Sequence, residues 1–183
     1  MEEILDLLII KPNKISDWFR IYRLYLKAFP KYERKPFSVI YNMYKKGKSD
    51  VWYCTADGSF AGLGITINGP DTILLDYFAV DGARRGEGIG SALLAKFLEL
   101  YNDRGFFLEI ESTFVPADNS EERIKRKSFY LHNGLEEMGT EAYLFGTRME
   151  LLGKGCRLDF DQYRNFYRDN YGQWAADNIK PLE

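Results

Sequence analysis

The stretch from residue 72 to residue 90 constrains the fold of this chain most strongly. An apolar run of β-branched and aromatic residues ends at Asp81, a glycine-rich turn with two arginines follows, and an apolar-periodic segment then begins. This pattern predicts a strand, a loop and the first turn of a helix. The loop glycines are Gly86, Gly88 and Gly90. Glycines spaced in this way let successive N–H groups point into one concavity at the positive end of the helix, so we expect the loop to hold phosphate oxygens.

Three kinds of glycine loop compete for this stretch. A P-loop needs Lys and then Ser or Thr after its last glycine, but Ser91 follows Gly90 directly. A dinucleotide fingerprint needs a glycine where Ser91 stands, and an acid at the end of the next strand in a βαβ unit. The third pattern, Arg/Gln-x-x-Gly-x-Gly/Ala, is met by Arg85, Gly88 and Gly90. The glycines alone are also compatible with a plain strand-to-helix turn.

The residues after the loop repeat the alternation of helix and strand. Apolar residues recur at helical spacing over 89–101 and end at Gly105, a residue type common after a helix. The segment 106–112 reads as a buried strand, and 120–133 as a helix. The end of that helix carries Ser-Phe-Tyr-Leu-His-Asn-Gly-Leu, residues 128–135.

The loop resembles motif A of the GCN5-related N-acetyltransferases, the GNAT superfamily. Residues 128–135 resemble motif B of the same family, whose usual form is Phe-Tyr-x-x-x-Gly-Phe, with Leu135 in place of the common Phe. The order and spacing agree over residues 60–150, and the flanking segments look like a bacterial subgroup of unassigned substrate. The resemblance implies a mixed α/β fold. Its sheet would be mostly antiparallel with one splayed parallel strand pair, flanked by helices.

The resemblance also implies acetyl-CoA as cosubstrate, held by the end of a strand, the loop and the motif B helix. The residues that it assigns to the coenzyme are Phe78, Ala79, Val80, Arg85, Gly86, Glu87, Gly88, Ile89, Gly90, Ser91, Arg123 and Tyr130. The Asn that the family usually carries in the motif B helix is replaced by Arg123, so no role of that Asn transfers. The basic run from Arg123 to Lys127 fits a solvated helix face as well as a site near the coenzyme's 3′-phosphate.

Transfer of an acyl group from a thioester to an amine needs a base, donors for the oxyanion and a proton for the thiolate. The resemblance makes Tyr130 the candidate acid; the alternative is a packed aromatic residue. Asp76 is an acid in an apolar strand, where strict alternation would put it on one face with Phe78, and it is our candidate base. Glu109 and Glu111 share a face of the next strand and are rivals. For all three acids the alternative role is to pair with a buried Arg.

Histidine and cysteine provide no further catalytic site. The single histidine, His132, has no second histidine near it, and Cys54 and Cys156 are far apart in sequence, so neither a zinc site nor a Cys–His pair is predicted. We expect His132 to stabilise a helix end. Two cysteines do not suit a disulfide scaffold and fit a reducing compartment.

The composition fits a single intracellular domain. The chain has 183 residues, 45% of them hydrophobic, enough for one full core. A formal charge of −2 and a pI near 5.6 give no electrostatic reason to expect nucleic acid or an anionic membrane as partner. The first ten residues lack the basic start and cleavage site of a signal peptide, and no run is long enough to cross a bilayer. We therefore expect a cytoplasmic protein.

We divide the chain into a GNAT domain, 1–153, and a helical extension, 154–183, packed on the same domain. In the extension, aromatic residues recur at three and four positions over 159–172, which predicts an amphipathic helix. Its aromatic face suits packing on the sheet; a homodimer contact or a wall of the acceptor pocket are the alternatives.

The remaining elements follow from periodicity and turn residues. We predict a helix over 15–28 with Ser16 as its N-cap, and a second helix opened by Pro36. The predicted strands are 4–10, 51–56, 60–67, 136–146 and 147–152, with Asp57-Gly58 as the turn of a hairpin.

These observations predict an acetyl-CoA-dependent N-acetyltransferase that moves an acetyl group directly to a primary amine, without metal. The acceptor stays open among small amines, antibiotics and peptides. The alternatives are a non-catalytic acyl-CoA-binding sensor and an enzyme that transfers a longer acyl group.

Overall fold

The computed structural model describes residues 5–182, which form two compact units. One unit runs up to Asn68 and includes Leu75–Leu100; the other comprises Gly69–Leu74 and the chain from Tyr101 onward. The strand β4 (Thr72–Val80) therefore begins in the second unit and ends in the first.

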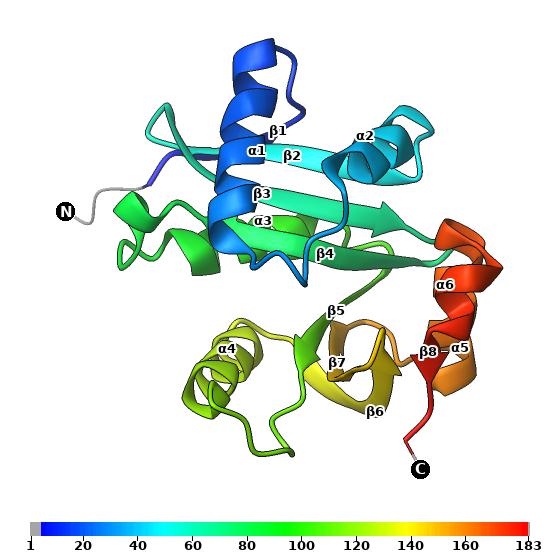
Figure 1. Cartoon of the computed structure of the whole chain (residues 1–183). Coiled ribbons are helices and arrows are strands. Elements are labelled where there is room, and N and C mark those ends of the chain that lie inside the picture. The colour runs from blue at the N-terminus through cyan, green and yellow to red at the C-terminus, as the bar shows by residue number, and fades with distance from the viewer. Residues whose placement is uncertain (1–4, 183) are drawn as a thin grey trace. The chain divides into compact units, whose positions relative to one another are not determined.

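The first unit holds, in chain order, β1 (Leu7–Ile10), α1 (Ile15–Ala28), α2 (Phe37–Lys45), β2 (Ser49–Ala56), β3 (Ser59–Asn68), the end of β4, the short 3-10 helix η1 (Gly82–Arg84) and α3 (Ile89–Leu100). The second holds the start of β4, then β5 (Gly105–Glu111), α4 (Ser120–His132), β6 (Glu136–Leu144), β7 (Thr147–Lys154), α5 (Phe160–Tyr171), α6 (Gln173–Asp177) and β8 (Ile179–Lys180). Figure 1 shows the whole chain, coloured from blue at the N-terminus to red at the C-terminus, with its elements labelled where there is room.

The strands follow the order β1-β2-β3-β4-β5-β7-β6-β8. The pairs β1–β2, β2–β3, β5–β7, β6–β7 and β6–β8 are antiparallel, and β4–β5 is parallel. The fold is thus the predicted mixed α/β fold with a mostly antiparallel sheet and one parallel pair. That pair is short, because the register joins only Thr72–Leu74 to Gly105–Phe107.

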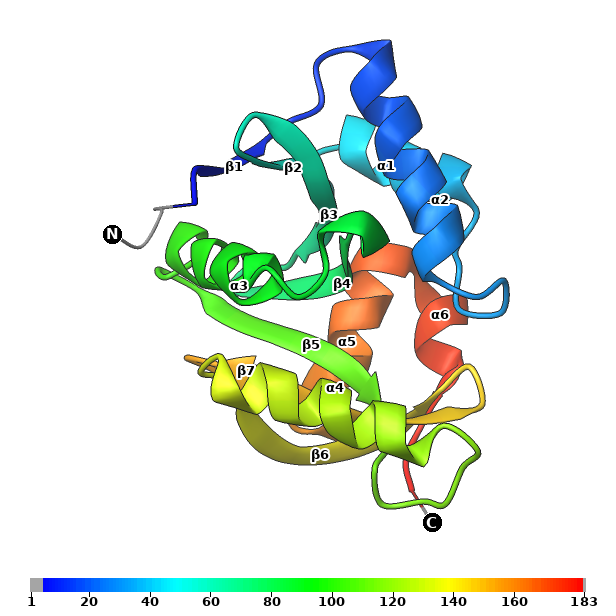
Figure 2. The same ribbon diagram turned by 90° about the vertical axis from the view of Figure 1, so that its left-hand side faces the viewer.

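In the first unit α1 and α2 cover one face of β2–β4, and α3 covers the other (Figure 2). Alternating strand residues explain the arrangement. Tyr53 and Leu63 belong to the core that α1 closes, whereas their neighbours Trp52 and Gly64 meet Phe97 of α3. A Cβ added to Gly64 would lie 2.3 Å from the Phe97 ring, so the ring packs directly on the backbone of β3.

In the second unit α4 lies on one side of β5, β7 and β6, and α5 lies on the other side (Figure 1). Phe107 of β5 meets Phe166 of α5 edge-on at 5.0 Å. At the end of the chain β8 adds to β6, pairing Ile179 with Leu144. The aromatic face of the predicted tail helix is therefore used for packing within this unit.

The helices and hairpins that were predicted from periodicity are present. Ser16 is wrong as N-cap, because α1 begins at Ile15 with Lys14 as its N-cap, and the Asp17 carboxylate accepts from the N–H groups of Asn13 and Lys14 at 3.2 Å and 3.1 Å. Ile4, the first residue of a predicted strand, lies outside the described residues. The elements η1, α6 and β8 were not predicted; they are too short for a periodic signal.

Candidate functional site

The glycine loop after β4 has the backbone conformation that its sequence requires. Gly86 and Gly88 have φ of 88° and 73°, in the left-handed region, and a Cβ on either would have no atom within 4 Å. The turn into the loop is fixed by Asp81, whose carboxylate caps η1 by accepting from the Ala83 N–H at 3.2 Å. Glycine at these two positions thus permits the left-handed backbone conformation, and the space beside the loop backbone stays open.

The loop amides have no acceptor among the described residues. Within residues 5–182, no backbone or side-chain group accepts a hydrogen bond from any N–H of residues 85–91, and the first bond of α3 runs from Ala92 N to Gly88 O at 3.1 Å. The first amides of α3 add the positive end of its dipole. This is the arrangement that binds phosphate oxygens.

The two loop arginines differ in their contacts. Arg84 donates to Glu87 Oε2 at 2.7 Å, to the Ala56 carbonyl at 3.3 Å and to Asp57 at 3.4 Å. The hydrogen bond to Glu87 raises the pKa of Arg84 further. Arg85 is exposed, and its guanidinium has no partner among the described side chains. Arg84 therefore holds the loop in place, and Arg85 is left for a ligand.

The end of β4 offers two further amides. Asp81 N donates to Ala61 O of β3 at 2.8 Å, and the Ala79 carbonyl approaches Gly62 of the same strand. Because backbone groups alternate along a strand, the amides of Phe78 and Val80 point to the other edge. The ladder to β5 has already ended at Leu74.

Asp76 is buried in the first unit and paired with a lysine. Its side chain is 4% exposed, and the Lys35 ammonium lies 2.6 Å from Oδ1 and 2.8 Å from Oδ2. The alternative role considered for this acid was to pair with a buried arginine; the structure has Lys35 instead, from the segment between α1 and α2.

Side chains alternate between the two faces of β4 next to Asp76. Tyr77 and Ala79 belong to the core that α1 closes, whereas Phe78 meets Phe97 of α3. Lys35 contacts Asp76 through its ammonium and Tyr77 through its backbone N–H. That Asp76 and Phe78 share one face stays a prediction.

The two rival acids lie in the second unit and are also engaged. Tyr163 and Tyr167 of α5 both donate to Glu109 Oε1 at 2.7 Å. Glu111 Oε1 accepts from Arg123 at 2.8 Å, and Oε2 accepts from the Asn119 amide at 3.1 Å. The two glutamates thus face different partners.

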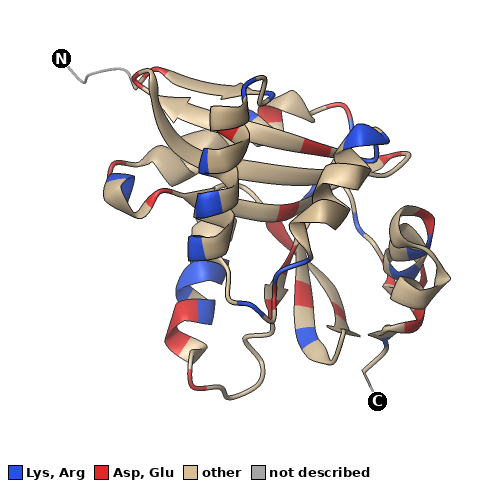
Figure 3. Cartoon of the chain, turned by 45° about the horizontal axis from the view of Figure 1, so that its top comes forward, with Lys and Arg blue, Asp and Glu red and all other residues tan. Residues whose placement is uncertain are grey.

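Arg123, which the resemblance assigned to the coenzyme, has partners on all three guanidinium nitrogens. Besides Glu111, it donates to Asn119 Oδ1 at 2.8 Å and to the Ser112 carbonyl at 3.1 Å, and its side chain is 13% exposed. Figure 3 shows the basic residues that follow one another along α4. Lys125 and Arg126 are exposed as a solvated face would be, whereas Arg123 and Lys127 are not.

Tyr130 of α4 is half-buried, and its ring meets Phe129 at 5.2 Å in an edge contact. Burial raises the pKa of its hydroxyl to about 12, and Arg126 opposes that shift. No described group hydrogen-bonds to this hydroxyl. A hydroxyl that stays protonated and lacks a protein partner is available as a donor to a ligand.

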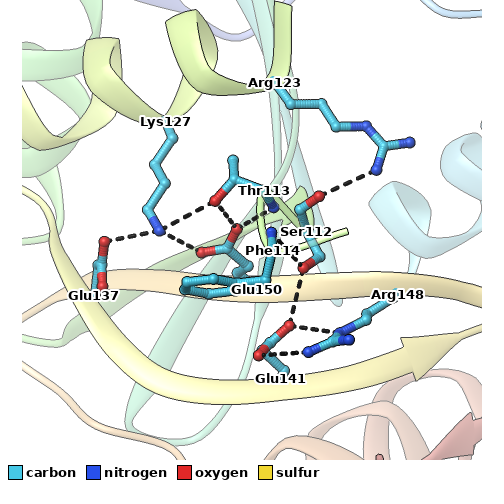
Figure 4. Close-up of polar contacts among 9 residues, drawn as sticks. All are labelled: Ser112, Thr113, Phe114, Arg123, Lys127, Glu137, Glu141, Arg148 and Glu150. Carbon is cyan, nitrogen blue, oxygen red and sulfur yellow. Dashed lines mark hydrogen bonds and ion pairs between the residues drawn. The ribbon is translucent and has the colours of Figure 1, made fainter. Parts of the chain in front are cut away.

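A second polar group lies beneath α4, and we call it the α4 cluster: Thr113, Lys127, Glu137 and Glu150 (Figure 4). The Lys127 ammonium lies 2.6 Å from Glu150 and 2.7 Å from Glu137. Glu150 accepts from the Thr113 hydroxyl at 2.7 Å and from its N–H. Burial alone would lower the pKa of Lys127, but the bonds to Glu137 and Glu150 outweigh it and raise that pKa.

Beside the α4 cluster, Arg148 donates to both carboxylate oxygens of Glu141 at 2.8 Å and 3.1 Å, and Ser112 donates to Glu141 at 3.0 Å (Figure 4). The Arg148 guanidinium is the largest cause that lowers the pKa of Glu141. These groups were not predicted from the sequence. Glu150 carried a usable signal, because it is the single acid of β7 and is flanked by Met149 and Leu151; Lys35 carried none, because it lies in an ordinary basic loop.

Cysteine, histidine and metal chemistry find no support in the described residues. Both cysteines are free, and burial raises the pKa of each thiol. His132 Nδ1 lies 2.7 Å from the Ser128 carbonyl, one turn back in the same helix. No group of three potential metal ligands occurs within residues 5–182. None of the helices in the described part of the chain has the length and apolar character that a membrane span requires.

Comparisons with known proteins agree with this geometry. The profile of the acetyltransferase (GNAT) family matches residues 18–122, more than half of the chain. A GNAT-family protein from Bacteroides thetaiotaomicron has the same fold with a TM-score of 0.77 at 19% identity, covering 92% of this chain and 99% of its own. No curated protein sequence matches the chain.

Two further structures share the fold. A Bacillus subtilis acetyltransferase in complex with CoA has a TM-score of 0.60 at 15% identity, over 81% of this chain and 97% of its own. The ribosomal-protein-S18-alanine N-acetyltransferase of Escherichia coli has a TM-score of 0.56 at 19% identity, over 84% and 96%. The match of the family profile shows that this chain belongs to the GNAT acetyltransferase family.

Proposed function

We propose that this protein is an acetyl-CoA-dependent N-acetyltransferase that moves the acetyl group directly to a primary amine. The run of unpaired amides over residues 85–91 supports this function most directly, since it offers a pyrophosphate the donors that the protein itself does not use. The exposed Arg85 supplies a positive charge at the same loop. The amides of Phe78 and Val80 would hold the pantetheine arm.

Tyr130 is the proposed acid. Its hydroxyl is protonated at neutral pH because burial raises its pKa to about 12, and it has no described protein partner. A donor of this kind would protonate the leaving thiolate. Its assignment rests on the motif B resemblance together with these two properties.

Asp76 is the proposed base, ahead of Glu111 and Glu109. Glu111 is bound by an arginine and an amide, and Glu109 by two tyrosines, all from within one unit. Asp76 pairs instead with a primary ammonium, that of Lys35. An amine substrate is the same chemical group, so it could take the place of Lys35 beside this carboxylate. Arg123 is omitted from the coenzyme site because its nitrogens are engaged.

Transfer is proposed to be direct, without an acyl-enzyme. The only cysteines are Cys54 and Cys156, and burial disfavours the thiolate of both.

The coenzyme site is tested by Gly88→Asp. The new carboxylate would stand beside the pyrophosphate, and we expect acetyl-CoA affinity measured by calorimetry to fall at least about a hundredfold. Gly47→Asp is the matched control, because Gly47 has φ of 70° and equally open surroundings after α2. Unchanged affinity in Gly88→Asp would remove the phosphate site from this loop.

A non-catalytic acyl-CoA sensor is the second candidate, favoured by the fact that all three candidate bases have partners in the protein. Release of free coenzyme with a panel of primary amines separates the two functions. Turnover with any of them supports the enzyme, whereas tight acetyl-CoA binding without turnover on the whole panel supports the sensor.

A further inference from the structure

Lys35 is held in place more firmly than a surface lysine. Its backbone N–H donates to the Tyr77 hydroxyl at 3.0 Å, and its carbonyl accepts from the Tyr25 hydroxyl at 2.9 Å. The Tyr77 hydroxyl donates in turn to the Glu33 carbonyl at 2.9 Å. Burial raises the pKa of both tyrosines, that of Tyr25 to about 12, so both hydroxyls stay protonated and keep these bonds. The backbone of Lys35 is therefore fixed on both sides.

The side chain of Lys35 is positioned by Asp76 and Tyr77 of β4. Its ammonium bridges both oxygens of Asp76 and lies 5.3 Å from the centre of the Tyr77 ring. The Lys35 side chain is 24% exposed, so it is partly open to solvent although it is paired. A fixed backbone and a fixed ammonium lower the entropy cost of bringing this amine to a reaction partner.

In the pair of Lys35 and Asp76, Asp76 lies on the same strand, β4, as the proposed coenzyme site. Asp76 is two residues from Phe78, about 7 Å along the strand, and the Phe78 amide points to the edge that β5 does not cover. The loop amides of residues 85–91 lie at the end of the same strand in the same unit. An extended thiol arm whose pyrophosphate sits at the loop would run back along this edge toward Asp76.

A second lysine in this unit lacks that neighbour. Lys11 pairs with Asp50 and lies 3.7 Å from the centre of the Trp52 ring, a carboxylate and an aromatic ring as at Lys35. Asp50 and Trp52 belong to β2, however, and β2 carries no glycine loop. Lys11 is therefore a matched control for an ion-paired lysine with no access to a thioester on β4.

We propose that Lys35 is an internal acetyl acceptor, so that the protein acetylates itself at this residue. The proposal rests on the proposed function. Asp76 takes a proton from the Lys35 ammonium, the free amine attacks the thioester carbonyl, the C–N bond forms and the C–S bond breaks. The electron pair leaves with the thiolate, the new amide nitrogen loses its second proton, and that proton balances the one that the thiolate gains when it is released as coenzyme A. The acetylated side chain is neutral, so the ion pair between Lys35 and Asp76 is lost.

The test is incubation of the full-length protein with acetyl-CoA alone, followed by mass spectrometry of its peptides. We expect acetylation of Lys35 at a rate at least about tenfold above that of Lys11, independent of protein concentration because the transfer is intramolecular. Asp76→Asn should slow it by about tenfold or more, because no carboxylate takes the proton. Lys35→Arg keeps a cation beside Asp76 and removes the acceptor.

The outcomes separate this inference from the proposed function. Equal rates at Lys35 and Lys11, or a Lys35 rate that persists in Gly88→Asp, would show chemical acetylation and overturn the inference. A parent protein that binds acetyl-CoA and acetylates an amine of the panel while Lys35 stays unmodified would overturn it too, with the enzyme function intact. A parent protein that does not bind acetyl-CoA would overturn both.

Discussion

The glycine loop of the first unit and the α4 cluster of the second are both polar, but they use their polar groups in opposite ways. Over residues 85–91 the backbone donors have no acceptor in the part of the chain that the structure describes. In the α4 cluster the buried Glu150 carboxylate accepts three contacts, from the Lys127 ammonium and from two groups of Thr113. The loop amides lie at the surface, where water satisfies them until a ligand arrives, whereas a buried carboxylate must find its partners within the chain.

The comparison gives a rule for reading the other charged residues. An acid whose oxygens meet fixed donors from its own unit, as Glu109 and Glu111 do, is accounted for by structure. An exposed group without a partner, such as Arg85, or a donor that lacks one, such as the Tyr130 hydroxyl, is left for function. Asp76 lies between these cases, because its partner is itself an amine of the kind the enzyme would take.

The largest effect is expected in the α4 cluster, from Lys127→Met. The Lys127 side chain is 11% exposed and that of Glu150 5%, so the change leaves a buried carboxylate without its counter-ion. We expect the free energy of unfolding to fall by about 3 kcal/mol, the lower end for a broken buried pair, because Thr113 still donates to Glu150.

Lys125→Met is the control for that loss. Lys125 lies on the same helix and pairs with Glu121 at 3.8 Å, but its side chain is 78% exposed. We expect its removal to change the free energy of unfolding in urea by less than about 0.5 kcal/mol. Equal effects of the two substitutions would show that the α4 cluster is no more important for stability than a surface pair.

The next effect concerns Tyr130→Phe, which removes the donor and keeps the ring. If the hydroxyl protonates the thiolate, kcat on the best amine should fall about a hundredfold with acetyl-CoA affinity nearly intact. Since the pKa of Tyr130 is about 12, its ionisation should produce no alkaline limb in the pH profile of the parent below about pH 11. Tyr143→Phe, at an exposed position in β6, is the control. A Tyr130→Phe enzyme within about twofold of the parent would make Tyr130 a packing residue.

Much of this fold and the loop could be predicted because their signals are local. A left-handed backbone conformation can be predicted from the residue types at Gly86 and Gly88 and at the hairpin turn Asp57-Gly58. The structure gives each of these residues a positive φ. The partners of the acids could not be predicted, because they come from far along the chain. Lys35 reaches Asp76 across 41 residues, and Tyr167 reaches Glu109 across 58. Only the packed fold decides which of many lysines and tyrosines arrives.

The two neighbouring loop arginines, Arg84 and Arg85, allow the same comparison between a group with protein partners and a group left for a ligand. Arg85→Ala should lower acetyl-CoA affinity about tenfold, the value of one charge-assisted contact at an exposed site, without changing the melting temperature. Arg84→Ala removes contacts to Glu87 and Asp57 and should lower affinity less, because it acts only through the shape of the loop. Calorimetry on both variants decides the order; a larger loss in Arg84→Ala would assign the ligand contact to the wrong arginine.

The smallest effect is expected from Glu141→Gln, next to the α4 cluster. Arg148 lowers the pKa of Glu141 below its ordinary value of 4.5, so the folded state favours the carboxylate. A group with a depressed folded pKa contributes stability above its unfolded pKa and loses it as the pH falls through the folded value. The substitution should therefore lower the melting temperature by about 2 °C at neutral pH, and the difference from the parent should shrink below pH 4.5. Melting curves across this range check the sign. A difference that grows on acidification would mean that the protonated acid, and not its pair with Arg148, is what the fold stabilises.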